Sequence, residues 1–283
     1  MSALFPIHRP VRILALAAAL VAVPDARASE KLNHFLPGGI LFPEYTAAAA
    51  INPAALPEEN TTVISGGFTP ETANYANRGY SAGLSWSNRT IGLGTDFVRR
   101  ESRVDGTARQ MAEVGFGARA KQFAFGLGFG HPLDDASVAA ATASSSSADD
   151  LYAGFLVGEE RGVRFGALID HLNASNTFEL GAGYGEPRKY NFGTTVSLPP
   201  AGVFTAGAVY TLKLAADLYA GPFGMAFATG YAYTPPSDTA AANGSMIPAT
   251  VALLWSTART WHFSLRTSPV GTSQLTLTLT HEF

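Results

Sequence analysis

The chain has 283 residues, of which 47% are hydrophobic and only 14% are charged, and its formal net charge at pH 7 is −3. A chain without a basic surplus is not expected to bind nucleic acid. The sequence contains no cysteine, which excludes a thiol nucleophile, a thiolate metal site and a disulfide framework.

The first 28 residues have the order of a secretory signal peptide. Arg9 and Arg12 precede an apolar run over residues 13–23, and Ala26-Arg27-Ala28 forms a small-x-small cleavage site. The apolar run is about half of the ~20 residues that a spanning helix needs. We therefore predict a signal peptide over residues 1–28 and a mature chain that begins near Ser29.

Residues 29–60 form a separate N-terminal segment. It is too apolar for an exposed tail, and proline and glycine interrupt it too often for a strand or a long helix. We predict that it is a plug, or hatch, inside a barrel. Its motif is Asn52-Pro53-Ala54, in which Asn52 is expected to cap a turn that Pro53 fixes before the first strand. The alternative is that Asn-Pro is an ordinary loop turn.

Beyond residue 60 the apolar side chains alternate with period two, which places them on one face of a strand. They occupy every second position in three runs: Tyr80, Ala82, Leu84 and Trp86; Phe123, Phe125, Leu127 and Phe129; and Phe178, Leu180, Ala182 and Tyr184. The positions between them are mostly Gly, Ser, Thr or charged. A soluble sandwich has similar alternation, but glycine on the polar face of strand after strand favours a barrel, whose lumen would then contain open volume. On this interpretation Gly126→Ser is expected to be mild.

The pattern predicts 14 strands, and their bounds are roughly 61–69, 79–87, 90–99, 109–119, 122–131, 150–158, 162–171, 177–185, 188–198, 203–219, 222–233, 248–257, 260–267 and 273–283. Residues 203–219 could be two short strands, but one parity throughout favours a single strand. Short turns then lie on one side, and the long connections, Pro132 to Asp149 and Thr234 to Ile247, lie on the other. We predict an all-β fold over residues 61–283: a transmembrane antiparallel β-barrel in a bacterial outer membrane, surrounded by outer-membrane lipids.

The last segment, residues 275–283, alternates up to a terminal Phe283. It resembles the signal by which outer-membrane barrels are recognised, so the barrel-assembly machinery is an expected partner. His281 departs from that signal, which usually has an aromatic or aliphatic residue at this position.

The Asn52-Pro53-Ala54 motif before the first strand, together with 14 strands, resembles the FadL/TodX-type outer-membrane channels, although this chain is much shorter than typical members. The resemblance implies a passive channel whose ligand is a small hydrophobic molecule such as a long-chain fatty acid or hydrocarbon. The alternative is a structural, adhesion or assembly-linked barrel with a permanently plugged lumen.

Charged residues of both signs have inward parity: Asp96, Glu113, Arg119, Arg164, Asp170, Glu179, Asp217, His262, Arg266 and Glu282. They are expected either to pair with each other and the plug or to line a polar path.

Catalysis and cofactors are not expected. His262 and Ser264 have the His-x-Ser spacing of outer-membrane phospholipases, but Leu265 replaces the asparagine that follows the serine in those enzymes, and the pair faces the lumen. The remaining histidines lack the spacing of a metal site. The sequence therefore predicts no enzyme, no cofactor and no metal.

Overall fold

The computed structural model describes residues 40–43, 48–58, 60–69, 77–102, 108–133, 149–159, 161–170, 172, 177–186, 189–198, 209–236, 241–257, 261–268 and 274–283. The predicted signal peptide and most of the long connection from Pro132 to Asp149 lie outside these residues.

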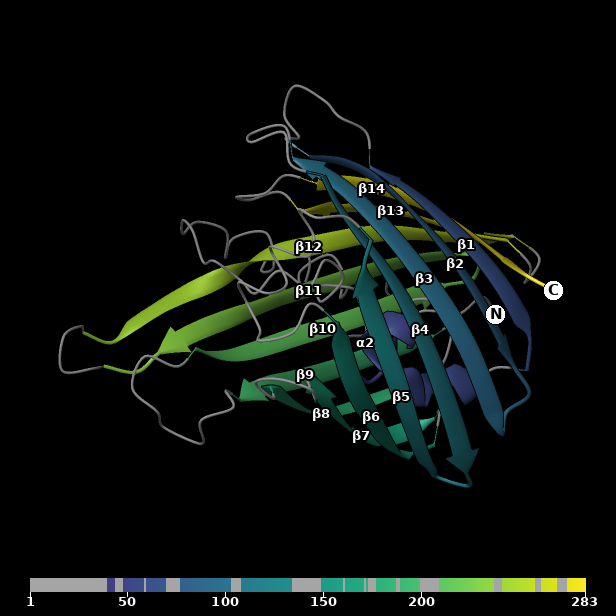
Figure 1. Cartoon of the computed structure of the whole chain (residues 1–283), viewed down its shortest axis with the longest axis horizontal. Coiled ribbons are helices and arrows are strands. Elements are labelled where there is room, and N and C mark those ends of the chain that lie inside the picture. Colours follow the sequence, from purple (N-terminus) through teal and green to yellow (C-terminus); the bar gives the residue numbers. More distant parts are fainter. Residues whose placement is uncertain are drawn as a thin grey trace, which may run out of the picture.

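Fourteen antiparallel strands form a closed barrel, in which each strand pairs with the next and β1 pairs with β14 (Figure 1). The strands are β1 (Thr62–Thr69), β2 (Asn77–Ser87), β3 (Ile91–Ser102), β4 (Ala108–Ala120), β5 (Phe123–Pro132), β6 (Asp150–Gly158), β7 (Gly162–Asp170), β8 (Thr177–Glu186), β9 (Tyr190–Leu198), β10 (Tyr210–Ala220), β11 (Phe223–Thr234), β12 (Asn243–Thr257), β13 (Trp261–Ser268) and β14 (Gln274–Glu282). The predicted fold class and the count of 14 strands are confirmed, and the described part of the doubtful segment 203–219 forms one strand, β10.

One connection differs from the prediction. Residues 234–247 were expected to form a long loop, whereas β12 begins at Asn243, which pairs with Thr234 of β11. A register shift between Ala228 and Gly230 moves the inward parity by one residue, and Pro248 interrupts the pattern further. The alternation of apolar residues is therefore interrupted inside β12, and the sequence-based prediction placed the start of this strand too late. In Figure 1 the β11–β12 hairpin extends beyond the other strands.

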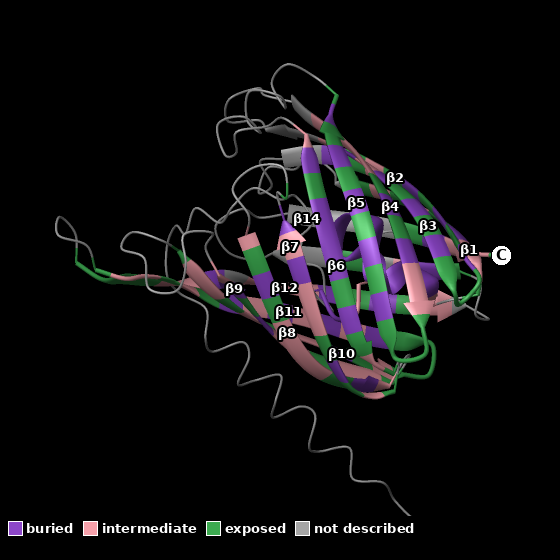
Figure 2. Ribbon diagram, turned by 60° about the horizontal axis from the view of Figure 1, so that its bottom comes forward, coloured by how far each residue is buried: buried purple, intermediate pink, exposed green. Residues whose placement is uncertain are grey.

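The outside of the barrel is apolar. Along β5, exposed and buried residues alternate without a break (Figure 2), and the exposed side chains are Phe123, Phe125, Leu127 and Phe129, at 60%, 37%, 42% and 44%. The residues that alternate with these side chains are Ala124, Gly126 and Gly128, and all three are buried. Large apolar groups outside and small groups inside are the arrangement of a barrel in lipid, which confirms the predicted faces.

Aromatic side chains gather at both ends of this outer surface. Near the short turns the exposed ones include Trp86, Phe123, Phe223, Trp255 and Trp261, and near the other end they include Phe68, Tyr80, Phe129, Tyr231 and Tyr233. Between the two sets lie exposed aliphatic residues such as Leu84, Leu93 and Leu253. Aromatic residues at both borders of an apolar band are typical of transmembrane barrels, where the rings lie at the two membrane interfaces.

A short segment lies against the inner face of the barrel. It comprises the turn Ile40–Pro43, the helix α2 (Ala48–Ile51) and the 3₁₀-helix η2 (Pro53–Glu58), and we refer to it as the inner segment. Its helices contact strands β2 to β6, and no strand from β10 to β14 makes a comparable contact with them in the described part of the chain. Neither of these helices is long and apolar enough to cross a membrane.

Inward glycines make room for the inner segment. A Cβ atom at Gly117 would collide with the carbonyl oxygen of Pro53, and one at Gly126 would collide with the backbone of Pro53 and Ala54. On β7, β8 and β9, Gly166, Gly181 and Gly193 lie against Leu41. The expectation that these glycines leave open volume is therefore wrong, because the inner segment already occupies the space. We accordingly expect Gly126→Ser to destabilise the barrel rather than to be mild.

Candidate functional site

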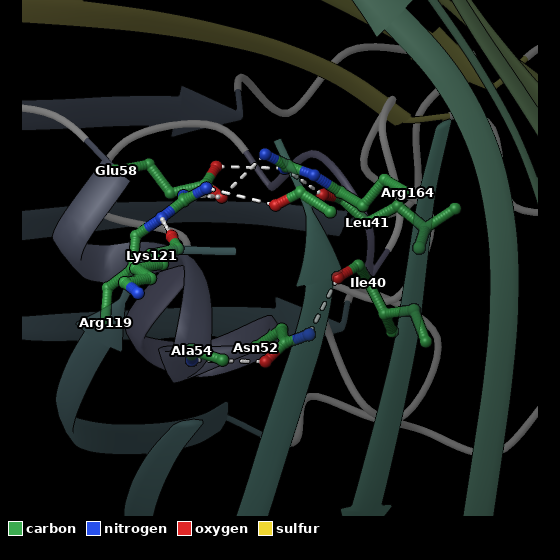
Figure 3. Close-up of polar contacts among 9 residues, drawn as sticks. Ile40, Leu41, Asn52, Ala54, Glu58, Arg119, Lys121 and Arg164 are labelled. Atoms are coloured by element: carbon green, nitrogen blue, oxygen red, sulfur yellow. Dashed lines mark hydrogen bonds and ion pairs between the residues drawn. The ribbon is translucent and has the colours of Figure 1, made fainter. Parts of the chain in front are cut away.

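Charged side chains attach the end of the inner segment to the barrel wall (Figure 3). Arg119 Nη1 of β4 lies 3.0 Å from Glu58 Oε1, and Arg164 Nη2 of β7 lies 2.7 Å from the same oxygen. Arg164 Nη1 also donates to Glu58 Oε2 at 3.0 Å. The side chains are only 13% (Arg119), 2% (Arg164) and 15% (Glu58) exposed. One carboxylate thus pairs with two arginines that are shielded from bulk water, and charge-assisted pairing of this kind is strong.

The same two arginines also bind backbone carbonyl groups. Arg164 Nη1 donates to the carbonyl of Leu41 at 2.7 Å, which ties β7 to the first turn of the inner segment, and its guanidinium lies 4.9 Å from the centre of the Phe42 ring. Arg119 donates to the carbonyls of Lys121 and Gly158 at 3.0 and 3.1 Å. Arg164 therefore holds both ends of the inner segment, whereas Arg119 connects its end to two wall turns.

The predicted motif lies at the centre of the inner segment. Asn52 is completely buried; its Nδ2 donates to the carbonyl of Ile40 at 2.8 Å, and its Oδ1 accepts from the amide of Ala54 at 3.2 Å. The asparagine therefore caps the turn into η2, as its position before Pro53 led us to expect, and it also joins this turn to residue 40. On the wall side, the Tyr152 hydroxyl of β6 donates to the carbonyl of Ala49 at 2.6 Å.

The predicted lumen residues do not form one cluster but lie at separate places on the inner wall. Arg119 and Arg164 meet at Glu58, whereas Asp96 and Glu113 face each other across β3 and β4. Glu179 of β8 lies elsewhere, where its Oε1 accepts from Lys213 Nζ at 2.7 Å and from Ser197 Oγ at 2.9 Å. Among the described residues no group of three or more His, Asp or Glu could hold a metal ion.

Three further predicted residues are Asp170, Arg266 and Phe283. Asp170 is buried at the end of β7, and the side chain of Arg266 lies outside the described residues. Phe283 is 71% exposed; its amide donates to the carbonyl of Thr62 at 2.9 Å, which fixes the C-terminus beside β1. Its ring and the Trp261 ring each contact His281, at 4.3 and 4.1 Å between ring centres. His281 thus packs as an aromatic residue at the position where it departs from the assembly signal.

The inner face of β11 and β12 carries an apolar strip. Ala226, Ala252 and Leu254 form a buried cluster against which Tyr219 of β10 packs. Polar groups flank it, with Asp217 of β10 on one side and His262 of β13 on the other, and both are buried. In the described part of the chain, the strip lies on strands that make no contact with the helices of the inner segment comparable to that of β2 to β6.

Sequence reasoning missed one polar contact on this wall. His262 Nδ1 lies 2.9 Å from Ser256 Oγ of β12, and His262 Nε2 lies 3.2 Å from Glu282 Oε1 of β14, although this second contact is not aligned as a hydrogen bond. The sequence had indicated Ser264 as the serine near His262. The short connection between β12 and β13 could have indicated this contact, because the register of the two strands places Ser256 directly opposite His262.

Comparison with known proteins adds little. No protein-family model matches the chain, and no curated protein matches it. A mutant of the Rh. blastica porin has 8% identity and a TM-score of 0.42, with 78% of this chain and 99% of the porin covered. A bacterial polysaccharide outer-membrane secretin has 10% identity and a TM-score of 0.42, with 79% and 98% covered. These values are too low to carry an argument about function, and the barrel rests on its own strand pairing.

Proposed function

We propose that this chain is a bacterial outer-membrane channel that conducts small hydrophobic or amphipathic molecules past a seated plug. The membrane location is supported by the apolar outer band and its aromatic borders, because only a closed barrel can place so many apolar strand residues in lipid while pairing every backbone group. Among the described residues each strand pairs with a neighbour on both sides, so the barrel has no unpaired edge strand.

The observation that carries the proposal is that the inner segment covers only one part of the inner wall of the barrel. The inner segment packs on β2 to β9 and leaves the inner faces of β10 to β14 without a comparable contact with its helices. The apolar strip of Ala226, Ala252 and Leu254 lies on this second half, beside Asp217 and His262. Apolar walls with a few polar groups suit a ligand that has an apolar chain and a polar head, such as a fatty acid.

A second function is favoured by the tight seating of the inner segment. Glu58, Arg119 and Arg164 form a shielded ion network, and the backbone of Pro53 fills the space beside Gly117 and Gly126. A plug held in this way could remain closed permanently. The protein would then be a structural or adhesion barrel whose outer loops bind partners.

Binding and transport separate these two functions. We expect the folded protein in detergent to bind the fluorescent fatty acid cis-parinaric acid, and Ala252→Phe to weaken binding about tenfold because the added ring fills the apolar strip. Ala82→Phe is the matched control, since Ala82 faces outward and is exposed. Equal binding by the wild type and Ala252→Phe would overturn the route along β11 and β12. Absence of both binding and fatty-acid uptake into proteoliposomes would favour the permanently closed barrel.

A further inference from the structure

A serine, a histidine and a glutamate meet at the rim of the lumen, on strands that, within the described ranges, make no contact with the helices of the inner segment comparable to that of β2 to β6. Ser256 is the next-to-last residue of β12, His262 is the second residue of β13, and Glu282 is the last residue of β14. These three strands are neighbours in the barrel (Figure 1). All three residues therefore lie within two positions of the short-turn end, where a molecule could reach them without crossing the lumen.

The order of the contacts is that of an activated nucleophile. Glu282 Oε1 lies 3.2 Å from His262 Nε2, and the other ring nitrogen, Nδ1, lies 2.9 Å from Ser256 Oγ. A carboxylate beside Nε2 favours the tautomer with its proton on Nε2, which leaves the Nδ1 lone pair to accept the serine proton. A base within about 2.6–3.2 Å of a hydroxyl is the geometry of an activated nucleophile. The Glu282 carboxylate acts on the ring through its charge, because its contact with Nε2 is not aligned as a hydrogen bond.

Ser256 is partly exposed, and the side chains of His262 and Glu282 are 10% and 14% exposed. The site is therefore largely shielded from bulk water, but the serine is not fully buried. The amide of Ser256 donates to the carbonyl of Pro222 at 2.8 Å, which holds the serine backbone against the neighbouring turn.

We propose that Ser256, His262 and Glu282 form an esterase site at the short-turn mouth of the barrel, with carboxylic esters as its substrate class. Ser256 Oγ bonds to the ester carbonyl carbon while its proton passes to His262 Nδ1. His262 returns that proton to the leaving alcohol as the ester C–O bond breaks. Water then loses a proton to the same nitrogen and adds to the acyl carbon. The bond between the acyl carbon and Ser256 Oγ breaks as His262 Nδ1 returns the proton to Oγ, which releases the carboxylic acid and restores the serine. Glu282 is a positioning residue, and the site does not depend on the proposed channel.

An alkyl fluorophosphonate tests the nucleophile directly in the full-length, detergent-folded protein. The probe forms a stable bond to an activated serine, and peptide mass spectrometry of the wild type identifies the modified residue. We expect the adduct on Ser256, and a rate of labelling at least about 100-fold lower in His262→Ala, which is the lower end of what a general base contributes. Heat-unfolded protein should not be labelled.

Two serine variants serve as controls. Ser197 also faces the lumen, but its hydroxyl donates to Glu179 rather than to a histidine, so Ser197→Ala should be labelled at the wild-type rate. Ser264→Ala tests the serine that the sequence had indicated and should also be labelled normally.

For Glu282, the glutamine variant should slow labelling and the aspartate variant should restore it, because only aspartate retains the charge.

The proposal is overturned if the folded wild type carries no adduct on Ser256, or if His262→Ala is labelled as fast as the wild type. An adduct on Ser264 alone would also overturn it. If Ser256 is labelled, hydrolysis of a short-chain p-nitrophenyl ester should be lost in Ser256→Ala, and hydrolysis that persists in this variant would assign the activity to another group.

Discussion

Removing the charge of Glu58 is the most direct test of how the inner segment is held. Glu58→Gln keeps the size of the side chain but leaves Arg119 and Arg164 facing a neutral amide, and the Arg164 side chain is only 2% exposed. Breaking a buried ion pair from one side costs ~3–5 kcal/mol, and the 15% exposure of Glu58 places the expected cost near the lower end. At about 1.4 kcal/mol per factor of ten, local opening of the inner segment should become about 100-fold more frequent.

Hydrogen–deuterium exchange of the folded protein measures this opening. Amides of residues 48–58 should exchange about 100-fold faster in Glu58→Gln, while those of β11 and β12 should be unchanged. The matched control is Glu186→Gln, which removes a 2.7 Å pair with Lys189 whose lysine side chain is 64% exposed, and exposed pairs are worth only ~0–1 kcal/mol. If residues 48–58 exchange at the wild-type rate in Glu58→Gln, or if all strands exchange faster to the same extent, the ion network does not anchor the inner segment.

Three further predictions concern the wall and the membrane. Gly126→Ala should lower the midpoint of thermal unfolding, because overpacking costs ~1–3 kcal/mol. Gly66→Ala should not lower it, since the new methyl group meets nothing closer than 3.9 Å. Equal midpoints for the two variants would contradict the packing on Gly126. Phe125→Arg should cost ~2–4 kcal/mol near the bilayer midplane, measured by urea unfolding in lipid, and Gln122→Arg at the adjacent turn should cost little; similar costs would contradict the assigned faces. The three tryptophans, Trp86, Trp255 and Trp261, all lie outward near the short turns. Lipids brominated near the headgroup should therefore quench tryptophan fluorescence more than lipids brominated deep in the acyl chain. Stronger quenching by the deep bromines would contradict this placement.

The barrel could be predicted because strand periodicity carries its information locally. In β5 the run Phe123 to Phe129 identifies the lipid face without any knowledge of neighbouring strands, and repetition along the chain gives the strand count. The strand limits were less certain where the pattern is irregular. The register shift beside Ala228 and the proline at position 248 concealed the start of β12 at Asn243.

The contents of the lumen could not be predicted in the same way. Periodicity shows that Gly126 faces inward, but it does not show that the backbone of Pro53 and Ala54 fills the space beside it. The pairing of Arg164 with Glu58 joins residues 106 positions apart, and no local pattern encodes that distance. Ser256 was missed because its partner depends on cross-strand register rather than on the His-x-Ser spacing that led to Ser264.

The contacts of the inner segment also indicate where its release would begin. Freeing only the turn Ile40–Pro43 breaks the hydrogen bonds from Asn52 to Ile40 and from Arg164 to Leu41. Each of these hydrogen bonds contributes ~0.5–3 kcal/mol, so freeing the turn alone costs less than freeing the turn and the helices together. Freeing the helices as well would break the Glu58 network, at a further ~3–5 kcal/mol. Any opening in transport should therefore start at this turn, beside β7 to β9.

Disulfide cross-linking tests this order, since the chain has no cysteine of its own. Leu41 lies against Gly181, so the pair Leu41→Cys and Gly181→Cys should lock the turn and reduce fatty-acid uptake into proteoliposomes, and reduction of the disulfide should restore it. The pair Ala49→Cys and Gly94→Cys locks α2 instead, because a Cβ atom at Gly94 lies 3.0 Å from the Ala49 Cβ, and it should leave uptake unchanged if the helices keep their place during transport. If locking α2 stops uptake and locking the turn does not, the helices must move first, and the energetic ordering of these contacts is wrong.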